Sequence, residues 1–149
     1  MSLLRNSLIG IVVLVAAGAA FYQFGQRPVD NLWGPAIGKG NTTEFISEID
    51  LGPIIPELAG YHFRSRYIDV PKNGIVRIHS HFGRPAFSYV ASSTVEQYRS
   101  DTPKDRRPLV LPTGSLTMDY NMAHWWRNVG PEPARWYVTD IYPATKKGE

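Results

Sequence analysis

The chain has 149 residues, of which 43% are hydrophobic and 12% aromatic, and its formal net charge is +3. This composition excludes an intrinsically disordered chain and predicts one folded domain with an appendage. The densest basic cluster is the short stretch from Lys104 to Arg107, so no nucleic-acid partner is expected, because such a surface needs a longer basic stripe. The absence of cysteine excludes disulfides, thiolate metal sites and cysteine nucleophiles.

The N-terminal segment is uncharged over residues 6–26, with the apolar core "SLIGIVVLVAAGAAFYQF". A helix of this length spans about 31 Å, enough to cross the hydrocarbon core of a membrane. We therefore predict a single-pass transmembrane anchor over residues 1–26, with the C-terminal domain on the outer (periplasmic or extracellular) side. Residues 17–19 also match a signal-peptide cleavage pattern, and cleavage there would give a secreted protein.

Residues 27–59 are rich in turn-forming glycine and proline and are predicted to be a tether and lead-in. Within them, "NTTEFISEIDL" (residues 41–51) fits two structures. Asn41 as N-cap followed by Glu44 favours a short helix, whereas the alternation of apolar and polar residues favours an edge strand. The sequence leaves both open.

From Gly60 onward, short β-like runs alternate with turn residues, and no helical period of ten or more residues appears. This pattern predicts an all-β barrel or sandwich over residues 60–143, followed by a tail at 144–149. The expected strands are residues 61–70, 75–81, 85–91, 94–100, 108–111, 115–118, 124–128 and 134–143.

Two histidines in "IHSHFGRPAFSYV" (residues 78–90) are the main chemical signal. On a strand, His79 and His81 point to the same face, roughly 6–7 Å apart along the chain, which lets two imidazoles converge on one metal ion. His124 opens "HWWRN" far away in the sequence, and distant strands of a β-barrel can lie side by side. His79, His81 and His124 are therefore the candidate metal ligands.

Strand alternation places the neighbours of His124 on two faces. Trp126 and Asn128 share its face, where Trp126 either lines a cavity or packs in the core, and Asn128 is expected to hold a turn by hydrogen bonds. Trp125 and Arg127 point away.

A second polar face is expected in the strand at residues 61–70. His62, Arg64 and Arg66 alternate there with Tyr61 and other aromatic residues. The simplest interpretation is a solvated edge, and the alternative is an anion-binding wall.

The histidine pattern resembles the cupin family. The first cupin motif is matched at Gly74, His79 and His81, with Ala86 in place of the glutamate, and the second at Pro112, Gly114, His124 and Asn128. The resemblance covers roughly residues 60–143. It implies a small β-barrel of the jelly-roll type, with metal ligands in its mouth, and oxygenation or isomerisation as typical chemistries.

Ala86 leaves the expected site with three neutral imidazoles and no carboxylate. Such a site is suited to Zn, Cu, Fe or Ni, with Mn as a further candidate, or it is degenerate and metal-free. Ser88 shares the inward face of Ala86, and Tyr89 points outward. Asp119, expected in a loop, could swing in as a carboxylate ligand.

Two functions follow. The first is a membrane-anchored cupin-domain protein that binds a divalent metal, a small molecule or both, with enzyme status and catalytic residues open. The alternative is a non-catalytic accessory subunit of a larger membrane complex, with Trp33, Trp125 and Trp136 as exposed aromatic contacts. The expected partners are membrane lipid, other membrane subunits and, by resemblance, a second copy in a homodimer.

Overall fold

The computed structural model describes residues 26–144. The predicted transmembrane anchor, apart from its last residue Gln26, and the alternative cleavage site lie outside these residues. Within residues 26–144, no helix is long and apolar enough to cross a membrane. The helical elements of this range are two short 3-10 turns, at Pro56–Leu58 and Lys104–Arg106.

The described chain is all-β, as expected. The eight strands predicted after Gly60 all form, and each begins and ends within one residue of its predicted limits. In chain order the strands are β1 (Gln26–Val29), β2 (Leu32–Pro35), β3 (Thr42–Asp50), β4 (Tyr61–Val70), β5 (Ile75–Ser80), β6 (Ala86–Ser92), β7 (Thr94–Arg99), β8 (Leu109–Pro112), β9 (Leu116–Asp119), β10 (Ala123–Asn128) and β11 (Ala134–Pro143).

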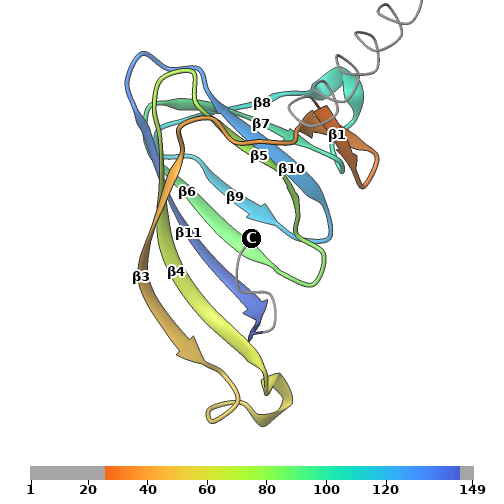
Figure 1. Cartoon of the computed structure of the whole chain (residues 1–149), viewed down its shortest axis with the longest axis vertical. Helices are drawn as coiled ribbons and strands as arrows, with labels where there is room; N and C mark the ends of the chain where they lie inside the picture. Colours follow the sequence, from red (N-terminus) through yellow and green to blue (C-terminus); the bar gives the residue numbers. More distant parts are fainter. Residues whose placement is uncertain (1–25, 145–149) are drawn as a thin grey trace, which may run out of the picture.

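The strands form two main antiparallel sheets that face each other (Figure 1). One has the order β5-β10-β7-β8 and the other the order β3-β4-β11-β6-β9. Strands distant in the sequence are neighbours in space, because β10 pairs with β5 and β11 lies between β4 and β6. This arrangement is a double-sheet jelly roll.

The segment expected to be a tether is instead part of the fold. β1 and β2 form a hairpin whose two turn residues, Asp30 and Asn31, have φ of 48° and 64°, as a tight two-residue turn requires. The hairpin packs on the sheet of β5 and β10, where Trp125 donates a hydrogen bond to the carbonyl of Trp33. β3 pairs along β4, so residues 41–51 adopt the edge-strand alternative.

The hydrophobic core lies between the sheets. Trp126 of β10 and Trp136 of β11 stack there with ring centroids 5.0 Å apart, and neither is more than 2% exposed. Val70 and Val95 pack around them. The expectation that Trp136 is a surface aromatic is therefore wrong, because β11 packs the face that carries Trp136 and Val138 against the other sheet. Trp33, at 62% exposed, does lie on the surface.

The predicted solvated edge of β4 is also wrong. Arg64 and Arg66 converge on the buried carboxylate of Asp140 in β11: Arg64 donates two hydrogen bonds of 3.0 and 2.8 Å, and Arg66 donates two of 2.9 Å. The Nε of Arg84 is 3.8 Å from the same carboxylate. Asp140 is 1% exposed and Arg66 8%. The third member of the predicted face, His62, pairs with Glu48.

Asp140→Asn is expected to destabilise the fold by about 3–5 kcal/mol, since removing one partner leaves buried guanidinium charge without its counter-ion. The matched control is Asp69→Asn, which breaks a half-exposed pair with Arg135 and should cost about 0–1 kcal/mol. Urea unfolding at pH 7 measures both. Equal effects of the two substitutions would contradict the assignment.

The stability that Asp140 contributes should depend on pH. Burial alone would raise the pKa of Asp140, but the hydrogen bonds and charges of Arg64 and Arg66 outweigh it and lower the pKa below the usual value. A lowered carboxylate pKa stabilises the fold at pH values above the unfolded pKa of about 4, and the effect is lost as the pH falls further. The gap between wild type and Asp140→Asn should therefore narrow in acid.

Candidate metal centre

The turn of His79 toward the interior depends on a β-bulge. In the pairing of β5 with β10, His79 lies opposite His124 and Val76 opposite Trp126, so two residues of β5 face one of β10. A bulge of this kind re-aims the side chains that follow it. As a result Val76 and His79 both face the space between the sheets, although regular alternation would separate them.

The structure brings the three predicted histidines together. The Nε2 atom of His79 lies 3.2 Å from Nε2 of His81 and 3.0 Å from Nε2 of His124. All three residues offer a nitrogen within 4.8 Å of the others. His81 and His124 are buried, at 1% and 2% exposed, whereas His79 is half-buried.

The outer ring nitrogens fix which atoms face the centre. The Nδ1 atoms of His79 and His81 each lie 2.9 Å from a backbone carbonyl, of Arg77 and Arg84 respectively. A carbonyl only accepts, so in the neutral imidazoles the proton sits on Nδ1 and the lone pair on Nε2. Two lone pairs at 3.2 Å cannot hydrogen-bond to each other. A cation bound between the two Nε2 atoms would relieve the repulsion between their lone pairs.

The third ring has a different outer contact. Nδ1 of His124 lies 2.7 Å from Nε2 of Gln97 and 3.4 Å from a carboxylate oxygen of Asp119. The Gln97 amide donates, so in the metal-free neutral form Nε2 carries the proton. For Nε2 of His124 to bind a metal, its proton must move to Nδ1. The carboxylate of Asp119, 3.4 Å from Nδ1, is the nearby group that can accept a hydrogen bond from the proton there.

The local electrostatics keep two of these rings uncharged. Burial, together with the neighbouring His124 and Arg84, lowers the pKa of His81 to about 3. Burial and the two other imidazoles lower the pKa of His79 well below its usual range. Neutral imidazole is the form that binds a metal.

Asp119 is not in a loop but ends β9, fully buried, directly opposite Ala86. It accepts hydrogen bonds from Ser88 (3.2 Å), Gln97 (2.8 Å) and Arg99 (2.9 Å). Burial alone would raise the pKa of Asp119, but His124, His81 and the hydrogen bond from Gln97 lower it below the usual value. Asp119 is thus an ionised carboxylate beside one candidate ligand, held by its own donors.

Ala86 has a carboxylate on each side in the sheet. Its Cα partner in β9 is Asp119 and its partner in β11 is Asp140, both buried. Position 86, where a glutamate was expected from the sequence resemblance, therefore lies between two acids. Ser88 faces inward at 3% exposed and Tyr89 outward at 40%, as predicted.

The three imidazoles line a cavity of about 20 Å³, close to the space that one water molecule or one ion occupies. Trp126 lines it too, and its Nε1 lies 3.3 Å from Nδ1 of His124. The predicted turn role of Asn128 is confirmed, since its amide donates to the carbonyls of Val70 and Glu132. Arg127 is exposed, as predicted.

Sequence reasoning missed the residues that support the histidines. Gln97 and Arg99 on β7 hold Asp119, and the carbonyl of Arg84 orients His81. The alternating burial of β7 was a weak signal for the first two. Arg84 had none, because it lies in a loop whose path depends on the strands around it.

The fold is that of the cupins. No model of a known protein family matches the sequence, and no curated protein matches it significantly. Among solved structures it is similar to the cupin domain of Schizosaccharomyces pombe Cnp3 (TM-score 0.55, 9% identity, 74% of this chain and 68% of that one). It is also similar to the polyketide cyclase RemF of Streptomyces resistomycificus (0.51, 19%, 72% and 67%). A third is the Cupin_2 domain of an XRE-family transcriptional regulator from Enterobacter cloacae (0.50, 13%, 70% and 99%).

A glutamate at position 86 should lower the stability of the fold. Ala86→Glu adds a buried carboxylate between Asp119 and Asp140, so overpacking and like-charge repulsion together should destabilise the fold by about 3 kcal/mol or more at pH 7. Phe87→Glu is the matched control, because Phe87 is 46% exposed and should change stability by less than about 1 kcal/mol. Chemical unfolding compares the two. An Ala86→Glu variant as stable as wild type would contradict this account.

Proposed function

We propose that the domain binds one divalent transition-metal ion through His79, His81 and His124. The observation that carries the proposal is the meeting of the Nε2 atoms of His79 and His81, whose Nδ1 atoms both face backbone carbonyls, in a cavity of ionic size. An all-imidazole donor set suits Zn, Cu, Fe and Ni, and suits Mn less well. Asp119 supports the proposal as a buried negative charge beside His124 that offsets part of the ion's charge.

Three protein ligands leave an open position on such an ion, where it can polarise a water molecule or a bound small molecule. The half-buried ring of His79 lines both the metal cavity and a larger cleft outside it, so this is the side from which a ligand would enter. The hydrophobic indoles of Trp126 and Trp136 also line the metal cavity. The residues select no particular reaction, so the proposal is of metal and small-molecule binding.

The full-length protein, purified in mild detergent and reconstituted with Zn²⁺, Fe²⁺, Ni²⁺, Cu²⁺ or Mn²⁺ in turn, should retain about one ion per chain of at least one of these metals. His79→Ala combined with His81→Ala should abolish the retention. His62→Ala is the matched control, since this histidine lies on β4 and pairs with Glu48. Elemental analysis gives the stoichiometry and circular dichroism checks the fold. Wild-type protein without any of the five metals would refute the proposal.

We propose further that residues 1–26 anchor the domain in a membrane, with the folded part on the outer side. The support is the uncharged run of residues 6–26, long enough to span a bilayer. Membrane fractionation tests it: the intact chain should stay in the pellet after carbonate extraction. A soluble product whose N-terminal sequence begins near Ala20 would show instead that the segment is cleaved and the protein secreted.

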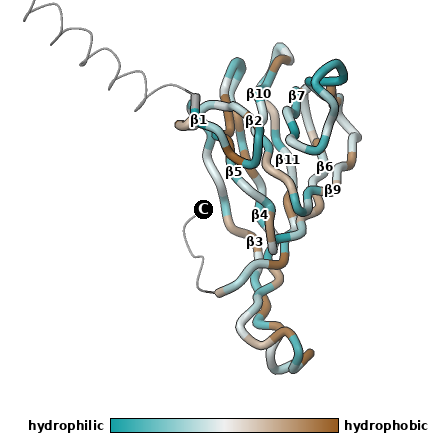
Figure 2. Tube along the Cα trace, turned by 90° about the vertical axis from the view of Figure 1, so that its right-hand side faces the viewer, coloured by the Kyte–Doolittle hydropathy of each residue, from teal (hydrophilic) through white to brown (hydrophobic). Residues whose placement is uncertain are grey.

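The alternative, an accessory subunit with a metal-free site, is favoured by one surface. Exposed apolar and aromatic side chains cover the outer face of β6, β9 and β11: Phe87, Tyr89, Leu116, Met118 and Tyr137. Figure 2 shows a further hydrophobic stretch in the loop after β3, where Ile54 and Ile55 are exposed. Native protein that co-purifies with membrane subunits and lacks metal would favour this function.

A further inference from the structure

A cleft of about 470 Å³ opens beside the metal cavity. Arg66, Ile68, Val76 and His79 line both spaces, so the cleft and the cavity share a wall. The volume is within the range of sites that hold small molecules. A ligand in the cleft would therefore lie against the half-buried edge of the histidine cluster.

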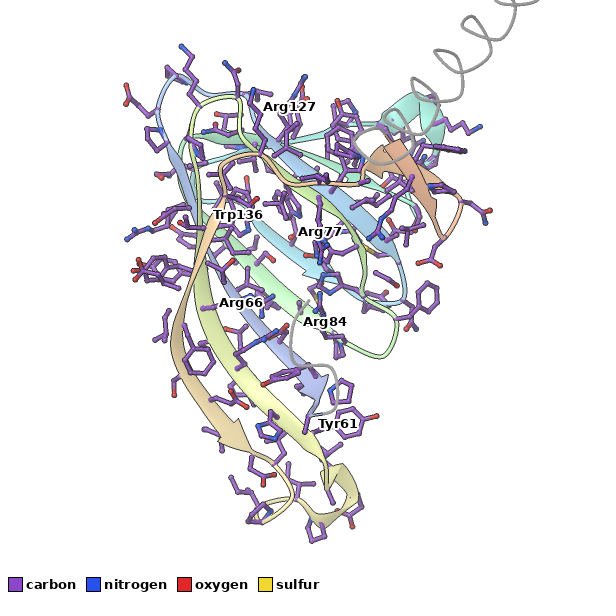
Figure 3. All side chains as sticks on the ribbon, in the orientation of Figure 1. Tyr61, Arg66, Arg77, Arg84, Arg127 and Trp136 are labelled. Carbon is purple, nitrogen blue, oxygen red and sulfur yellow. The ribbon has the colours of Figure 1, made fainter. Side chains whose placement is uncertain are left out.

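The charged side chains that line the cleft are all positive among residues 26–144. Four arginines contribute to its lining, no Asp or Glu does so among residues 26–144, and the remaining polar side chains are neutral. The arginines are Arg64, Arg66, Arg77 and Arg84. Asn41 and Thr43 add polar side chains from the segment of β3. In Figure 3, Arg66, Arg77 and Arg84 are labelled in the region between the two sheets, whereas Arg127 lies apart at the upper end.

Asp140 does not contribute a negative charge to the lining of the cleft. It sits behind the arginines, 1% exposed, and is not part of the lining. Its oxygens engage Nε and Nη2 of Arg64 and Nη1 of Arg66. No hydrogen bond within residues 26–144 uses Nη1 of Arg64 or Nε and Nη2 of Arg66. Asp140 thus holds the two guanidinium groups in place, and each group has donor atoms that no acceptor among residues 26–144 uses.

Fixed guanidinium groups favour one class of ligand. Arginine presents paired donors that match carboxylate and phosphate oxygens, and a side chain already ordered by an ion pair loses little entropy when the ligand arrives. A cationic ligand would meet like charge on this wall. The apolar side chains of Ile68 and Val76, in the wall shared with the metal cavity, suit the hydrocarbon part of a small organic molecule.

We propose that Arg64, Arg66, Arg77 and Arg84 form a subsite for the acid group of a small organic anion, carboxylate or phosphate, whose remainder lies toward His79. The contact with a metal rests on the proposed function, but the binding of the anion to the arginines does not. The substrate class of the domain is thereby narrowed to small organic acids or phosphate esters.

Isothermal titration of the full-length protein with succinate and with inorganic phosphate tests the subsite, and succinamide serves as the uncharged analogue of succinate. At least one of the two anions should bind, and succinamide should not. Affinity should fall as NaCl rises, because part of the wall is open to solvent. Binding of succinate alone assigns a carboxylate ligand and binding of phosphate alone a phosphate ligand. Failure of both anions overturns the proposal, as does equal binding of succinamide.

Arg77→Glu is the decisive variant. Arg77 is exposed on β5, so the substitution should leave the fold intact while weakening anion binding about tenfold or more. Arg127→Glu is the matched control: it reverses the same charge outside the cleft, where Arg127 pairs with Glu96, and should leave the affinity within about twofold. Arg77→Lys should restore part of the affinity. Equal losses in the two glutamate variants would mean non-specific attraction and would overturn the proposal.

The two proposals fail separately. If the variant with both His79→Ala and His81→Ala loses metal but still binds the anion, the arginine subsite stands on its own. If wild-type protein retains metal and binds no anion, the subsite is wrong and the metal centre stands. If it binds the anion and no metal, the metal proposal alone is refuted.

Discussion

The pairing of β10 with β5, with its bulge, is the constraint on which the centre depends. It joins two segments 45 residues apart, sets His79 opposite His124, and lets Val76 and His79 face the same interior. Without the extra residue, regular alternation would send one of these two side chains outward. The hairpin of β1 and β2 covers the outer side of the same pair of strands, so a segment with the composition of a linker stabilises the strands that carry the histidines.

The buried charges of the described residues are arranged in two groups, each around one carboxylate. Asp119 is held by Gln97 and Arg99 next to His124, and Asp140 is held by Arg64 and Arg66 next to the cleft. Buried carboxylates persist only with such partners. Ala86 separates the two groups in the sheet. A buried carboxylate thus lies on each side of Ala86, Asp119 on β9 and Asp140 on β11.

The two groups differ in the kind of ligand that their surroundings favour. Around Asp119 the donors of Gln97 and Arg99 are paired with acceptors of the fold, and the Nε2 lone pairs of His79 and His81 face the cavity. Around Asp140 the two bound guanidinium groups of Arg64 and Arg66 outnumber the carboxylate among residues 26–144, and both arginines also line the cleft. The proposed cation site and the proposed anion subsite share His79 and Arg66 in their linings, so each ligand would lower the electrostatic cost of binding the other.

Local sequence patterns determined much of this protein. Alternation and turn residues gave the strands after Gly60, and the spacing of His79 and His81 with the distant His124 indicated the candidate ligands, because both signals act over a few residues. Glycine and proline misled at residues 27–59, since they mark the turns of a hairpin as well as those of a linker. Only the tertiary structure decided that Trp136 is buried, that Asp119 faces Ala86, and that Arg64 and Arg66 meet Asp140. Those outcomes depend on which strands are neighbours across the sheets, and pairing between distant segments leaves no mark in the residues of either strand alone.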